Sequence, residues 1–86
     1  MTDEQKRLAI LGVLLKDGGW MRSFEIDVAL QWRPSTAYPV LREMREDLEA
    51  RWEPVGKGAG LKKRQYRVKA GKVSALKKEL KLARGE

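Results

Sequence analysis

A proline sets the register of the most constrained helix in this chain. The stretch Pro34-Ser35-Thr36-Ala37-Tyr38-Pro39 leads into apolar residues at helical spacing, namely Ala37, Leu41, Met44 and Leu48. Pro39 has no amide proton to donate, so it fits only in the first turn of a helix. The helix must therefore begin near Ser35 or Thr36, which are expected to cap it, and the spacing carries it to about Leu48.

Two other helices are expected before this one. Thr2 or Asp3 can cap the first, and Gly18-Gly19 stops it. Trp20-Met21-Arg22 has room for only one extended rung, after which Ser23 offers an N-cap for a helix from Phe24 to about Leu30.

A glycine-rich hairpin and a last helix are expected after it. The expected elements are a strand Arg51–Val55, a turn at Gly56–Gly60, a strand Arg64–Val68 and a helix from about Lys72 to Ala83. With 86 residues there is room for one domain. We therefore expect an α+β, mostly α, winged helix-turn-helix with a three-helix core, a two-stranded basic wing and a C-terminal helix. Residues 1–71 would form the winged-helix DNA-binding domain, and residues 72–86 a dimerisation element.

The excess of positive over negative charge lies entirely in the C-terminal part. Residues 1–50 hold 7 basic and 9 acidic side chains, and residues 51–86 hold 12 basic and 3 acidic ones, for a net charge of +7. A one-sided field of this kind attracts a polyanion, and nucleic acid is the usual one.

Composition argues against several other classes of protein. The chain has no cysteine and no histidine, which removes disulfides, thiolate metal sites and the commonest acid-base residue. It also lacks paired carboxylates and a phosphate-cradling motif, so we expect no enzyme, no cofactor and no metal site. No apolar run approaches the about 20 residues that span a bilayer, and the acidic start is unlike a signal peptide, so a cytoplasmic protein without a membrane partner is expected.

Four short motifs occur in order over about residues 8 to 72: Ile10-Leu11-Gly12-Val13-Leu14, Phe24-Glu25-Ile26, Thr36-Ala37-Tyr38-Pro39 with Leu41, and Arg64-Gln65-Tyr66-Arg67-Val68 with Ala70-Gly71. Together they resemble the PadR family of winged-helix transcriptional regulators. Members usually have a glycine after the third helix, where this chain has Asp47-Leu48-Glu49. Many also carry a longer C-terminal dimerisation region, and no small-molecule effector site is evident here.

The resemblance makes the third helix a recognition helix whose first turns enter the major groove, because acidic residues follow Arg42. The expected contacts to bases and flanking phosphates are Arg33, Ser35, Thr36, Tyr38 and Arg42. The alternative is that Ser35 and Thr36 only cap the helix and that Tyr38 is half-buried core. In the wing, Lys57, Lys62, Lys63 and Arg64 would reach phosphate or the minor groove, or else form a solvated tip.

The last helix and the tryptophans each allow two interpretations. Val73, Leu76, Leu80 and Ala83 form a narrow seam that suits a dimer interface. The lysines beside it could instead lie on an anionic membrane, but the helix lacks aromatic anchors for that role. Trp20, Trp32 and Trp52 are expected to fill the core or its edge, with an aromatic ligand platform as the alternative.

These observations together predict a sequence-specific duplex DNA-binding transcriptional regulator, a repressor that occludes a promoter as a homodimer. The alternative is a winged-helix module that binds a protein such as a polymerase, a recombinase or another regulator. Salt-dependent binding to random duplex would favour the first, and binding to a protein without DNA would favour the second.

Overall fold

Local signals at both ends of the first helix, α1 (Asp3–Asp17), are those expected from the sequence. Thr2 Oγ1 accepts a hydrogen bond from Gln5 N at 3.1 Å, and Gln5 Oε1 accepts one from Thr2 N at 2.8 Å, so the two residues form a capping box. At the other end Gly18 ends the helix with φ at 75°, a left-handed conformation that favours glycine. The expected first helix is confirmed.

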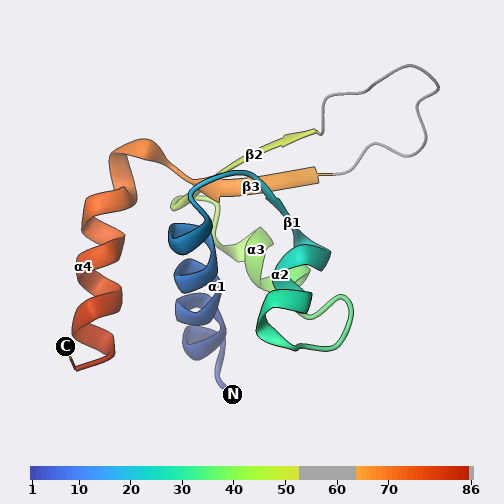
Figure 1. Cartoon of the computed structure of the whole chain (residues 1–86), viewed down its shortest axis with the longest axis horizontal. Coiled ribbons are helices and arrows are strands. Elements are labelled where there is room, and N and C mark those ends of the chain that lie inside the picture. The colour runs from blue at the N-terminus through green and yellow to red at the C-terminus, as the bar shows by residue number, and fades with distance from the viewer. Residues whose placement is uncertain (53–63, 86) are drawn as a thin grey trace.

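The computed structural model describes residues 1–52 and 64–85, which contain four α-helices and a three-stranded sheet (Figure 1). After α1 the elements are β1 (Met21–Arg22), α2 (Ser23–Leu30), α3 (Ala37–Glu43), β2 (Leu48–Trp52), β3 (Arg64–Val68), a short 3₁₀ helix (Ala70–Lys72) and α4 (Val73–Ala83). The expected small α+β class, mostly helical, is confirmed. In this part of the chain no helix is long and apolar enough to cross a membrane.

The sheet is antiparallel, in the order β1-β3-β2. Its central strand β3 pairs Tyr66 with Met21 on one side and with Ala50 on the other. Because side chains alternate along a strand, Tyr66 and Val68 turn inward to the core while Arg67 turns outward. The single rung at Met21–Arg22 and the strand Arg64–Val68 agree with the sequence analysis.

The third helix is shorter than its apolar spacing predicted. It ends at Glu43 instead of Leu48, and a hydrogen-bonded turn follows in which Asp47 N and Leu48 N both donate to Met44 O. Leu48 then pairs with Val68, so β2 begins at Leu48 and not at Arg51. Met44 and Leu48 are still buried, because a turn and a strand can bury the same residues as another helical turn. Residues 53–55, also expected in this strand, lie outside the described residues.

Two predicted caps are also corrected. Arg22 occupies the N-cap of α2 in place of Ser23, and its amide donates to Glu25 Oε1 at 2.8 Å. At α3 neither Ser35 nor Thr36 caps the helix with its hydroxyl. The Thr36 hydroxyl donates instead to the carbonyl of Arg33 at 2.6 Å.

The core forms where α1, α2 and α3 meet the inner face of the sheet. Its largest fully buried side chains are Ile10, Leu11, Leu14, Ile26 and Leu41. Figure 1 shows α1 between α4 and the α2–α3 pair, with the sheet across the ends of the helices. Within this arrangement α3 packs on both α1 and α2, which hold it in place.

The predicted dimer seam on α4 is used inside the chain. Leu76 and Leu80 are buried, α4 packs on α1, and Val73 lies against the core, while Ala83 is exposed. Gly12 lies at this contact, and a Cβ there would be in ordinary van der Waals contact with Leu80 Cδ2, at 3.8 Å. The expectation that Leu76 and Leu80 face a second chain is therefore corrected. The physical reason is that α1 provides the covering surface that the sequence pattern could not locate.

Candidate nucleic-acid interface

A buried carboxylate on α2 holds the start of α3. Asp27 is 4% exposed, and its two oxygens accept from different amides: Oδ2 from Ser35 N at 3.1 Å and Oδ1 from Ala37 N at 2.8 Å. Amides at a helix N-terminus have no partner within the helix, and a negative charge there is favourable. Asp27 therefore performs the capping that was expected of Ser35 and Thr36. It also fixes the orientation in which α3 presents Tyr38 and Arg42.

A groove between α3 and the hairpin is lined by arginines. We call it the arginine groove and define it by Tyr38, Arg42, Arg45, Arg64 and Tyr66. Apolar side chains of α3 and β2 complete its lining, namely Leu41, Leu48 and Ala50. No aspartate or glutamate is among the described residues that line it. Three guanidinium groups without an opposing carboxylate make this groove attractive to an anion.

A second hollow adjoins the first and is lined mainly by aromatic rings. We call it the aromatic hollow and define it by Arg22, Phe24, Tyr38, Trp52, Arg64 and Tyr66. It shares Tyr38, Arg64 and Tyr66 with the arginine groove, and the described residues that line it again include no acid. The two hollows thus form one continuous surface of arginines and aromatic rings.

Stacking and burial organise the side chains of this surface. The Arg42 guanidinium lies 5.8 Å from the centre of the Tyr38 ring, and the Arg64 guanidinium lies 5.5 Å from that of Trp52. Tyr66 is buried beneath them. Burial raises the pKa of its hydroxyl, and the nearby positive charges of Arg64 and Arg42 oppose this increase. The hydroxyl is therefore neutral at physiological pH and able to donate a hydrogen bond.

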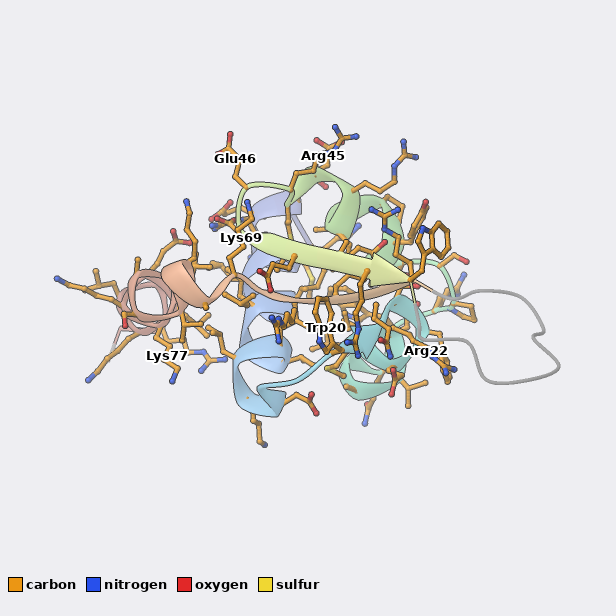
Figure 2. The ribbon with its side chains drawn as sticks, turned by 90° about the horizontal axis from the view of Figure 1, so that it is seen from above. Trp20, Arg22, Arg45, Glu46, Lys69 and Lys77 are labelled. Atoms are coloured by element: carbon orange, nitrogen blue, oxygen red, sulfur yellow. The ribbon has the colours of Figure 1, made fainter. Side chains whose placement is uncertain are left out.

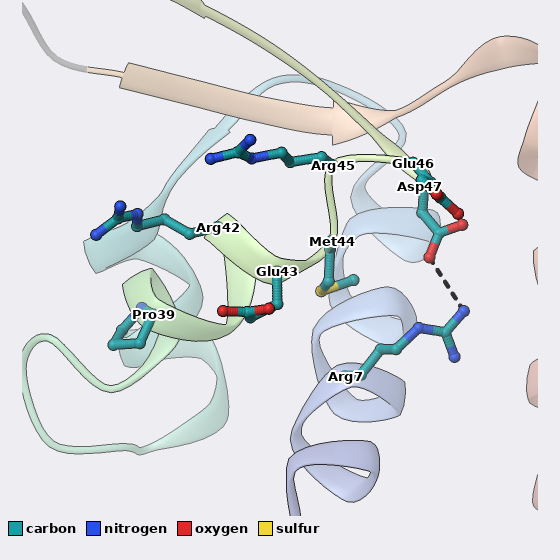
Figure 3. Close-up of a pocket in the computed structure, with 8 residues that line it drawn as sticks. All are labelled: Arg7, Pro39, Arg42, Glu43, Met44, Arg45, Glu46 and Asp47. Atoms are coloured by element: carbon teal, nitrogen blue, oxygen red, sulfur yellow. Dashed lines mark hydrogen bonds and ion pairs between the residues drawn. The ribbon is translucent and has the colours of Figure 1, made fainter.

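The acidic residues that follow Arg42 lie on another side of the turn. Glu43, Glu46 and Asp47 line an adjoining pocket beside Arg7 of α1, and Arg42 and Arg45 line both this pocket and the arginine groove. Figure 3 shows Asp47 turned toward Arg7 while Arg42 and Arg45 extend the other way. Asp47 Oδ2 lies 3.1 Å from an Arg7 terminal nitrogen. None of these three acids is among the described residues that line the arginine groove.

Arg7 also fixes α4 to this region. It forms an ion pair with Glu79 of α4 in addition to the one with Asp47. The hydrogen bond with Glu79 raises the pKa of the Arg7 guanidinium further above its usual value, and burial opposes this effect. Arg7 therefore links α1 to α4 and to the turn after α3.

The residues predicted to contact DNA separate into three groups. Tyr38, Arg42 and Arg64 meet in the arginine groove. Ser35 and Thr36 line a different hollow, beside the acidic start of α1, and Arg33 is exposed just before them. Lys57, Lys62 and Lys63 lie outside the described residues.

Sequence reasoning missed five members of the surface: Arg22, Phe24, Arg45, Trp52 and Tyr66. For Trp52 the signal lies in the strand register, because an antiparallel hairpin that pairs Leu48 with Val68 must place Trp52 across from Arg64. Trp52 was expected to be structural, yet 57% of it is exposed. Its exposure depends on a register that the amino-acid pattern alone did not determine.

The other two tryptophans have structural positions. Trp32 packs against the core. Trp20 lies on the outer face of the sheet, where the guanidinium groups of Arg51 and Arg67 lie 4.3 and 4.4 Å from its ring centre. In Figure 2 Trp20 lies on the β1 side of the strands and Arg45 lies beyond the β2 edge. The Trp20 cluster is therefore separate from the arginine groove.

Comparison with known proteins identifies the fold. No protein-family model matches this chain, and no curated protein matches its sequence. The structure is similar to the crystal structure of the circadian clock associated protein Pex from anabaena, with a TM-score of 0.73 and 18% sequence identity. The alignment covers 99% of this chain and 79% of that one. At this identity the likeness concerns the fold alone.

Proposed function

We propose that this chain is a winged helix-turn-helix protein of the PadR type that binds duplex DNA and regulates transcription. One observation carries the proposal: the arginine groove runs along α3 and the hairpin, and no acid is among the described residues that line it. The order of helices and strands and the excess positive charge of residues 51–86 support the same conclusion.

The groove offers both kinds of contact that DNA recognition needs. Arg42, Arg45 and Arg64 present guanidinium groups that fit phosphate oxygens with two parallel hydrogen bonds. Tyr38 is 45% exposed on the first turn of α3, where its ring can meet base edges or sugars. Arg45 replaces Ser35 and Thr36 in the site proposed here. The lysines of the predicted wing remain part of it on the sequence argument.

The proposal extends to repression by promoter occlusion, with two chains on a pseudo-palindromic site. Half-sites on the order of 10 base pairs apart would place two α3 helices in successive major grooves. Such a dimer must use a surface other than Leu76 and Leu80, which are buried against α1.

Salt dependence of binding tests the groove. Arg42→Gln with Arg64→Gln removes two charges from the groove, and Lys77→Gln with Lys78→Gln removes two from the exposed face of α4 as a charge-matched control. Titration of a labelled duplex at several salt concentrations gives the slope of log K against log salt. The groove variant should lose about 2 units of slope per bound chain, since each phosphate contact contributes about 0.9. Equal losses in both variants would mean that only net charge matters and would refute the groove as the interface.

The outer face of the sheet supports a second candidate, a protein-interaction module. Trp20, Arg51 and Arg67 cluster there, and tryptophan and arginine are enriched among the residues that dominate protein interfaces. If the chain binds no duplex at low salt and Trp20→Ala abolishes capture of a defined protein partner, this candidate becomes the better one.

A further inference from the structure

The aromatic hollow presents ring faces that a paired duplex cannot use. Phe24 and Trp52 are each 57% exposed, although large aromatic side chains are usually buried in small domains. They lie around one hollow with Tyr38 and Tyr66, and the four rings come from four different elements. A closed duplex offers phosphates, sugars and base edges to a protein, whereas base faces become accessible only in unpaired nucleotides.

The charges of the hollow favour a nucleotide over the other occupants. The Arg64 guanidinium lies over the Trp52 ring and places positive charge at the hollow. A second copy of this chain would bring the two copies of Arg64 toward each other, and an apolar peptide would offer Arg64 no negative charge. A nucleotide supplies a flat ring for the aromatic faces and a phosphate for Arg64. The combination of a basic groove and aromatic stacking platforms is typical of surfaces that bind single-stranded nucleic acid.

We propose that the aromatic hollow stacks an unpaired nucleobase, so that the preferred ligand is a duplex with an unpaired nucleotide beside its paired region. In this arrangement the arginine groove holds the phosphates of the paired part, and Phe24 and Trp52 stack the unpaired base. The inference rests on the proposed function for the first contact and adds the second. It names the form of DNA that this surface selects.

Three labelled DNAs with the same paired sequence test the idea: a fully paired duplex, this duplex with a two-thymine bulge, and this duplex with a bulge of two abasic sites. The abasic bulge keeps the phosphates and the flexible joint of the thymine bulge but has no base faces. The thymine bulge should bind more tightly than the abasic bulge by about 5- to 150-fold, the range for stacking one base on an aromatic side chain. Fluorescence anisotropy at fixed salt measures all three affinities.

Variants test whether the preference for the thymine bulge depends on the aromatic hollow. Trp52→Leu and Phe24→Leu should each reduce the ratio of thymine-bulge to abasic-bulge affinity toward one, while Arg42→Gln should weaken all three DNAs together. Val28→Ala is the matched control, because Val28 is an exposed apolar residue of α2 that does not line the hollow. Circular dichroism first confirms that each variant is folded.

Every outcome decides the matter. Equal affinity for the thymine and abasic bulges overturns the inference, as does a preference that survives in both Trp52→Leu and Phe24→Leu. A Trp52→Leu variant that changes molar mass by light scattering, without changing DNA preference, would assign the hollow to self-association and overturn it too. Absence of binding to all three DNAs would refute the proposed function itself, whereas tight duplex binding without a bulge preference refutes only the inference.

Discussion

Replacing Asp27 tests whether α3 is held in place by a carboxylate from another helix. Each Asp27 oxygen serves a different amide, and one of these amides belongs to Ala37, which is fully buried. Asp27→Ala leaves that amide without an acceptor and removes a negative charge from the start of α3. Losing an N-cap side chain costs about 0.5–2 kcal/mol, and a hydrogen bond to a charged group contributes about 1.5–3 kcal/mol.

We therefore expect Asp27→Ala to lower the free energy of unfolding by about 2–4 kcal/mol. For a domain of this size that corresponds to a decrease of about 10–25 °C in Tm. Asp27→Asn keeps the shape and one acceptor oxygen, but its amide nitrogen would face a backbone N–H, so an intermediate loss is expected. Urea denaturation followed by circular dichroism measures both variants.

Asp17→Asn is the matched control, because Asp17 is exposed and accepts a single bond, from Gly19 N at 3.2 Å. Its effect should stay within about 0.5 kcal/mol. If Asp27→Ala costs no more than Asp17→Asn, the carboxylate does not hold α3, and the capping argument is wrong.

Two further predictions concern packing and pH. Leu76→Ala should lower the free energy of unfolding of the single chain by about 2–4 kcal/mol, because Leu76 is buried. Leu82 is exposed on the same helix, so Leu82→Ala should change this free energy by less than about 0.5 kcal/mol. A Leu76→Ala variant of unchanged stability but altered molar mass would contradict the internal packing of α4. Because the pKa of Tyr66 is raised in the folded state, its hydroxyl keeps its proton to a higher pH there than in the unfolded state. The stability due to its burial is therefore fully present below the ordinary tyrosine pKa of about 10. This stability is lost as pH rises through the pKa of the folded state. Unfolding measured between pH 8 and pH 12 should show this loss in the parent and a smaller one in Tyr66→Phe, and identical profiles would contradict the assignment.

The amino-acid sequence by itself determined the features that depend on near neighbours. Thr2 and Gly18 end α1 through residues three or four positions away, and the strand Arg64–Val68 and the last helix follow from patterns of the same range. The segregation of positive charge toward the C-terminal part also needs no fold, and it already indicated a polyanionic partner. Tyr38, Arg42 and Arg64, which meet in the groove, were chosen from residue type and position alone.

Only the tertiary structure decided those features in which local preferences compete with contacts from distant residues. Apolar spacing carried the third helix to Leu48, but pairing with Val68 places that residue in a strand. Asp27 replaces two local hydroxyls as the cap of α3, and α1 covers the α4 seam that the pattern left open for a second chain. Trp52 joins Phe24 at one hollow only because the register of the sheet places it opposite Arg64. A sequence pattern reports contacts within a helical turn or along a strand, whereas these contacts join residues 8 or more positions apart, which only the packing of the whole chain brings together.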